Sequence, residues 1–73
     1  MHEAQVRRLN GNGSPNRIRA TTEDGARKAL GAFLEREYRL GETDIATITA
    51  ETEQVFTDFP EFDITARVFE VVG

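Results

Sequence analysis

The 73-residue chain contains no cysteine, one histidine and one serine. Without cysteine the protein can form neither disulfides nor thiolate metal sites. The single serine, Ser14, falls in a predicted turn, and the single histidine, His2, follows the first residue, so the pattern offers no nucleophile and base for covalent catalysis. We therefore expect a protein that is not an enzyme and that has no metal site and no cofactor.

Long apolar runs are also missing. No segment approaches the roughly 18 apolar residues of a membrane-spanning helix, and the first 16 residues, MHEAQVRRLNGNGSPN, lack the apolar core of a signal peptide. A chain of this length has room for one domain, which buries only about 60% of the surface that its unfolded chain exposes. These absences predict a soluble, cytoplasmic, single domain over residues 1–73 with no membrane contact.

Basic residues are scarce in the second half of the chain. Residues 1–40 hold eight basic and five acidic side chains, whereas residues 41–73 hold one basic and eight acidic, for a net charge of −4. Sequence halves interleave in a small fold, so we expect the two charges to cancel by ion pairing. The acidic half leaves open a mimic of nucleic acid, although same-face strand residues repeat only about every 6.6 Å, which is sparser than the charge of a duplex.

Alternation and turn residues predict a hairpin at the start of the chain. Residues 3–9 form a weak strand, residues 10–16 a turn, and residues 17–21 a second strand. A helix over residues 22–39 follows, because apolar side chains recur at steps of three and four behind a threonine cap. We expect Gly41 to end this helix in the left-handed conformation, and Gly31 to allow close approach to a strand.

The second half is predicted to add two more strands. Residues 45–56, IATITAETEQVF, alternate with Ala46, Ile48 and Ala50 inward, and residues 62–72 alternate after a turn at residues 57–61. The predicted order is therefore β-β-α-β-β. The expected fold class is α+β with two layers, in which one amphipathic helix packs on a three- or four-stranded antiparallel sheet.

The last predicted strand has apolar residues on both faces. If Val68 points toward the helix, Phe69 and Val71 point away from it. They then form an exposed apolar patch ringed by charge, which is the usual composition of a protein contact or a homodimer seam. The alternative is a bulge after Val68 that turns Phe69 inward. The predicted partner-binding residues are Phe69, Val71, Arg67, Glu51, Glu53 and Val55.

Arginines gather on the predicted hairpin. Arg7, Arg17 and Arg19 lie on or beside its strands and form a candidate anion contact for phosphates or for an acidic partner. Domains that bind nucleic acid are normally basic, and single-strand binders interleave aromatic side chains with arginines. The chain is acidic overall and its hairpin lacks aromatic residues, so we expect a solvated, partly ion-paired face that does not bind nucleic acid directly.

Residues 18–34, IRATTEDGARKALGAFL, resemble a segment shared by small domains of phages, plasmids and other mobile elements. In that segment a strand ends in alanine and threonine or serine, a capping residue follows, and an alanine-rich helix begins. Some such domains are similar in size and acidity to phage inhibitors of bacterial defence systems, including anti-CRISPR proteins. The resemblance implies an α+β fold and action by tight binding to another protein.

Together these patterns predict a non-enzymatic protein–protein interaction module of the kind that phage-encoded inhibitors use to cover a partner's surface. The predicted partner is another protein, such as a nucleic-acid-binding host complex, or a second copy of the chain. One alternative is a small homo-oligomeric structural protein that uses the same patch as its seam. The other is a nucleic-acid-binding module that uses the hairpin arginines.

Overall fold

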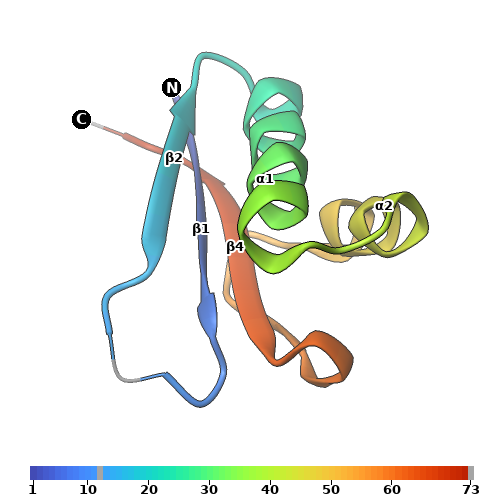
Figure 1. Ribbon diagram of the computed structural model, residues 1–73. Coiled ribbons are helices and arrows are strands. Elements are labelled where there is room, and N and C mark those ends of the chain that lie inside the picture. The colour runs from blue at the N-terminus through green and yellow to red at the C-terminus, as the bar shows by residue number, and fades with distance from the viewer. Residues whose placement is uncertain (12, 73) are drawn as a thin grey trace.

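The computed structural model describes residues 1–11 and 13–72 (Figure 1). Within these residues the fold is α+β, with one four-stranded antiparallel sheet and two α-helices. The order is β-β-α-α-β-β, so the predicted order with a single helix is wrong in its second half. The elements are β1 (His2–Arg8), β2 (Asn16–Ala20), α1 (Glu23–Tyr38), α2 (Glu42–Glu51), β3 (Thr57–Phe59), the 3₁₀ helix η1 (Pro60–Phe62) and β4 (Ile64–Glu70).

The first and last strands form the centre of the sheet. The strand order is β2-β1-β4-β3, and neighbouring strands are antiparallel. β1 and β4 pair along their whole lengths, from His2 opposite Glu70 to Arg8 opposite Ile64. The two chain ends therefore lie beside each other (Figure 1), and the N–H of Val71 donates to the carbonyl oxygen of Met1 at 2.8 Å.

Helix α1 has a cap at each end, formed by residues that flank it in the sequence. The hydroxyl of Thr22 accepts the backbone N–H of Gly25 at 3.0 Å, and two acidic residues follow in the first turn, where the helix dipole favours them. At the other end Arg39 adopts the left-handed conformation, with φ of 55°. The cap predicted at Gly41 is therefore wrong, because the left-handed residue comes two positions earlier and Gly41 is instead the residue before α2.

Residues 42–51 form helix α2 where the alternation predicted a strand over residues 45–56. The segment is ambiguous because Ile45, Ile48 and Thr52 also recur at helical steps of three and four. Ile48 and Thr52 are buried, whereas Ala46 and Ala50, which the alternation placed inward, are exposed. Three threonine hydroxyls bond back to carbonyl oxygens one turn earlier, as between Thr52 and Ile48 at 2.6 Å, and this satisfies polar groups that a strand would have sent to water.

The core lies between α1 and the sheet. Apolar side chains from β1, β4, α1 and α2 meet there, and Phe59 of β3 closes one end. Their alternation on β1 and β4 matches the predicted inward set. The core residues are Ala4, Val6, Ala26, Leu30, Leu34, Ile48, Phe59, Ile64, Ala66 and Val68.

Helix α2 packs beside α1 at Gly31. A Cβ atom added to Gly31 would lie 3.0 Å from Cγ2 of Ile45, so glycine permits the two helices to approach closely. The predicted close approach at Gly31 therefore occurs, but its partner is a helix and not a strand. Arg27 of α1 adds a polar tie, because its guanidinium donates to the carbonyl oxygens of Thr49 at 2.5 Å and Thr52 at 2.9 Å, at the end of α2.

Candidate binding face

One face of the sheet has no layer of helix over it, because α1 and α2 lie on the same side (Figure 1). We call the other side the outer face. Successive strand residues point to opposite faces, so the neighbours of the core residues along each strand point outward. The outer-face residues of the three longest strands are Glu3, Gln5, Arg7, Arg17, Arg19, Thr65, Arg67 and Phe69.

A chain of hydrogen bonds crosses the outer face from β2 to β4. Arg19 Nε donates to Glu3 Oε1 at 2.8 Å, Gln5 Nε2 donates to Glu3 Oε2 at 2.5 Å, and Arg67 Nε donates to Gln5 Oε1 at 2.9 Å. Glu3 and Gln5 are only 3% and 5% exposed, although no second layer covers them. The hydrogen bonds from Arg19 first and Gln5 second hold the pKa of Glu3 below its ordinary value of 4.5. We call this set the Glu3 network.

The Glu3 network ends at an arginine whose guanidinium contacts two aromatic rings. The guanidinium carbon of Arg67 lies 4.6 Å from the ring centroid of Phe56 and 4.4 Å from that of Phe69. Phe56 takes this place because Thr57 pairs with Ala66, which brings the preceding residue beside Arg67. Among the described residues the two Nη atoms of Arg67 have no hydrogen-bond partner. The Phe56-Arg67-Phe69 stack therefore presents the free edge of a fixed guanidinium.

The remaining outer-face arginines surround this stack. Arg7 places its guanidinium carbon 5.7 Å from the centroid of Phe56 and donates to the carbonyl oxygens of Arg8 and Gly11 at 3.2 and 3.4 Å. Arg17 is exposed and joins no ion pair among the described residues. The outer face thus carries four arginines against two carboxylates, those of Glu3 and of Asp58, which lies on β3 opposite Thr65.

The ion pairs do not cancel the charges of the two halves. The four pairs within the described residues are Arg19–Glu3, Arg27–Glu23, Lys28–Asp24 and Arg36–Glu37, and all of them lie inside residues 1–40. The predicted pairing between the halves is therefore wrong. It fails because the acidic residues of 41–73 lie mostly on α2 and around β3, whereas the arginines of β1 and β2 lie on the outer face or at the hairpin.

The structure separates the predicted partner-binding residues into two groups. Arg67 and Phe69 lie on the outer face, and β4 runs through them without the bulge that was the alternative. Val71 follows β4 and is half-buried beside Met1. The placement of the other three on this face is wrong, because α2 replaces the strand that would have carried them. Glu51 ends α2, and Glu53 and Val55 lie in the exposed connection to β3.

The predicted anion residues Arg7, Arg17 and Arg19 do share one face, as their alternation indicated. The sequence reasoning missed Phe56, Gln5 and Glu3. Phe56 was predicted to end a strand over residues 45–56, a segment that forms helix α2 and a connection. The spacing of two between Phe56 and Asp58 could have indicated that both lie on one face of the following strand. Glu3 and Gln5 read as ordinary solvated positions, because only the register of three strands brings their partners to them.

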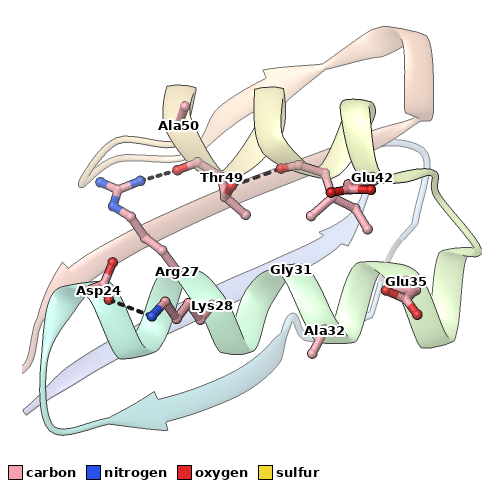
Figure 2. Close-up of a pocket in the computed structure, with 10 residues that line it drawn as sticks. Asp24, Arg27, Lys28, Gly31, Ala32, Glu35, Glu42, Thr49 and Ala50 are labelled. Atoms are coloured by element: carbon pink, nitrogen blue, oxygen red, sulfur yellow. Dashed lines mark hydrogen bonds and ion pairs between the residues drawn. The ribbon is translucent and has the colours of Figure 1, made fainter.

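A groove lies between α1 and α2 (Figure 2). This groove has a volume of about 650 Å³, and small side chains of both helices, among them Gly31, Ala32 and Ala50, form much of its wall. Its cations are already engaged, since Lys28 lies 3.3 Å from Asp24 and Arg27 donates to the end of α2. The groove therefore presents small side chains and cations that are already bonded, in contrast to the outer face.

Residues 1–11 and 13–72 contain no group of three or more histidine, aspartate or glutamate side chains placed to hold a metal ion. None of their helices is both long enough and apolar enough to span a membrane.

Comparisons with protein-family models, with curated proteins and with solved structures gave no match. The chemistry of the outer face is therefore the basis on which a function is proposed below.

Proposed function

We propose that this protein is a non-enzymatic interaction module that binds an acidic surface of a partner protein with its outer face. The observation that carries the proposal is the Phe56-Arg67-Phe69 stack on a sheet face that no helix covers. Arginine and aromatic side chains are enriched in protein interfaces and dominate their binding energy, because they combine apolar contact with directed hydrogen bonds.

Charge complementarity supports an acidic partner. The sheet carries four arginines on this face against two carboxylates, those of Glu3, which is already bonded to Arg19, and of Asp58, which lies on β3 opposite Thr65. Opposite charge on the partner would speed encounter and disfavour basic competitors. A standard interface buries about 800 Å² on each side, which is roughly a sixth of the 4739 Å² accessible surface of this chain. One face of the sheet is of that order.

A module of this size acts by covering a partner's surface, which suits an inhibitor. The similarity of residues 18–34 to phage and mobile-element domains points in the same direction, as does the binding mode of that class. An inhibitor of bacterial defence that masks an acidic patch of its target is thus the specific form of the proposal.

Charge reversal at Arg17 tests the face at a position that makes no ion pair among the described residues. The charge of Arg17 also favours the ionised form of Glu3, so Arg17→Glu should lower the unfolding free energy by up to about 1 kcal/mol and leave the protein folded. Lys28→Glu is the matched control, because Lys28 is an exposed cation on α1, away from the outer face. Each variant is used to capture proteins from a lysate of cells that encode the protein, and the captured protein is then purified for calorimetry.

We expect a one-to-one complex whose dissociation constant rises at least about tenfold in Arg17→Glu, in line with the cost of an unfavourable interfacial charge. Lys28→Glu should bind within about twofold of the wild type. Equal affinity of both variants would remove the outer face as the binding surface. Light scattering that finds a stable dimer in place of a complex would replace the proposal with the homo-oligomeric alternative.

A further inference from the structure

We infer that Arg67 is the anchor of the outer face and that its ligand is the carboxylate of an aspartate or glutamate side chain in the partner. This inference rests on the proposed function and specifies the chemistry of its central contact. It follows from which atoms of Arg67 are engaged within this chain and which are left.

Much of the Arg67 guanidinium is already in contact within this chain. Its guanidinium carbon lies over the rings of Phe56 and Phe69, 4.6 and 4.4 Å from their centroids. Its Nε donates to Gln5. What remains is the edge that carries the Nη atoms, with N–H groups in a planar fork whose geometry matches the two oxygens of a carboxylate. Because the side chain is already held, little rotamer entropy is lost when a ligand binds.

Arg67 also lacks a compensating negative charge. Gln5 is neutral, and the nearest carboxylate in the network, that of Glu3, accepts from Arg19 and Gln5. Arg36 shows the contrasting arrangement on α1, where its guanidinium carbon lies 5.7 Å from the ring of Phe33 but its Nε bonds the carboxylate of Glu37 at 3.1 Å. Both arginines sit over a ring, and only Arg67 is left to take its carboxylate from outside the described chain.

The same geometry favours a carboxylate over a nucleobase. Stacking of bases requires open ring faces, whereas Arg67 covers one face of both rings and Arg7 also lies over Phe56. The rings therefore hold the arginine and are not a platform for bases.

The register adds a distance requirement for the partner. Arg17 and Arg67 are the two cross-strand neighbours of Gln5, one on each side. Their strands are two strand spacings apart, or roughly 10 Å. A partner with two carboxylates separated by about that distance can therefore reach both arginines at once, the second as an exposed and salt-sensitive contact.

The test uses fluorescence anisotropy with three labelled probes, a decaglutamate peptide, a decaglutamine peptide and a ten-residue oligothymidylate. The proteins are the wild type, Arg67→Lys, Arg67→Gln and the matched control Arg36→Gln. Lysine keeps the charge of Arg67 and loses its planar fork, so Arg67→Lys separates the anchor from general attraction. Circular dichroism and thermal unfolding confirm that each variant is folded.

We expect the decaglutamate peptide to bind the wild type and Arg36→Gln equally, and both Arg67 variants at least about tenfold more weakly, as for the loss of a charge-assisted hydrogen-bonded pair. The decaglutamine peptide should not bind. Unchanged binding by folded Arg67→Lys would overturn the anchor, and so would tighter, Arg67-dependent binding of the oligothymidylate, which would assign the site to nucleic acid.

The two proposals fail in different ways. If a partner protein fails to bind Arg17→Glu but still binds Arg67→Lys, the outer face is the binding surface and Arg67 is not its anchor. Arg67-dependent binding of the acidic peptide, with no partner protein lost in Arg17→Glu, would support the anchor and remove the proposed function.

Discussion

At the scale of single residues, Glu3 shows how a thin layer of side chains can protect a carboxylate. It is 3% exposed on a face that has no helix above it, because the arginine and glutamine side chains around it form both its cover and its hydrogen-bond partners. A buried carboxylate that accepts two such bonds stays ionised, and removing one partner is costly because the charge is then left without compensation.

The lowered pKa of Glu3 makes stability depend on pH in a defined direction. A group whose folded pKa is depressed stabilises the protein fully above its unfolded value, here the ordinary 4.5, and loses that contribution as the pH falls through the folded pKa. We expect the unfolding free energy of the wild type to fall more steeply than that of Glu3→Gln below pH 4.5. Urea unfolding at a series of pH values measures this difference.

Glu23→Gln is the control for this experiment, because its side chain is an exposed partner of Arg27. It should follow the pH dependence of the wild type. Parallel curves for the wild type and Glu3→Gln would show that the Glu3 network does not stabilise the ionised carboxylate.

At the scale of elements, α2 is the segment where local pattern and tertiary packing disagree most. Residues 45–50 alternate in polarity as a strand does, and threonine and isoleucine favour strands. The helix forms nonetheless, because Ile45 and Ile48 find apolar contacts beside α1, and Arg27 satisfies carbonyl oxygens at its end. Packing of one face thus outweighs a modest difference in propensity.

The contact between α1 and α2 predicts that Gly31→Ala lowers the unfolding free energy when Ile45 is present and raises it when Ile45 is replaced by alanine. Gly31→Ala gains up to about 1 kcal/mol of helix propensity, but its Cβ would lie 3.0 Å from Cγ2 of the stiff, branched Ile45. We expect a net loss of about 1 kcal/mol, which is within the usual range for overpacking. Chemical unfolding of the four proteins of a double-mutant cycle with Ile45→Ala measures the coupling.

In the Ile45→Ala background the obstructing methyl group is gone, so Gly31→Ala should stabilise the protein. If Gly31→Ala stabilised the protein in both backgrounds, α2 would be able to shift and accommodate the added Cβ at little cost. The packing of the two helices would then not depend on glycine at position 31.

At the scale of the whole molecule, the first and last strands of the chain form the centre of the sheet. β1 and β4 are the outermost elements in sequence and the central strands in space, so the core is complete only when the two ends of the chain have paired. The same closure brings together Gln5 from one end with Arg67 from the other. The binding face therefore exists only in the complete fold.

Adjacent ends predict that the chain tolerates circular permutation. The N–H of Val71 donates to the carbonyl oxygen of Met1 at 2.8 Å, so a short flexible linker can connect the chain after Val71 back to Met1. New termini between the exposed residues Gly13 and Ser14 should leave the far-ultraviolet circular dichroism unchanged and the unfolding free energy within about 2 kcal/mol of the wild type. A second permutant, opened between Thr65 and Ala66 in β4, should not fold. Unfolding of the first would show that residues 9–15 hold the sheet together.

The sequence by itself determined the α+β class, the first hairpin, helix α1 and the alternation of β4 up to Arg67, whereas the pairing of Phe69 with Glu3 decided that no bulge turns Phe69 inward. The features that the sequence determined follow from local periods of two and 3.6 and from a cap within a few residues, which the chain expresses without its neighbours. Only the tertiary structure decided that residues 42–51 are helical, that Phe56 joins Arg67, and that Glu3 is buried. Each of these depends on contacts between residues far apart in the chain, and a strand pattern leaves its register and its neighbours unspecified until the whole sheet closes.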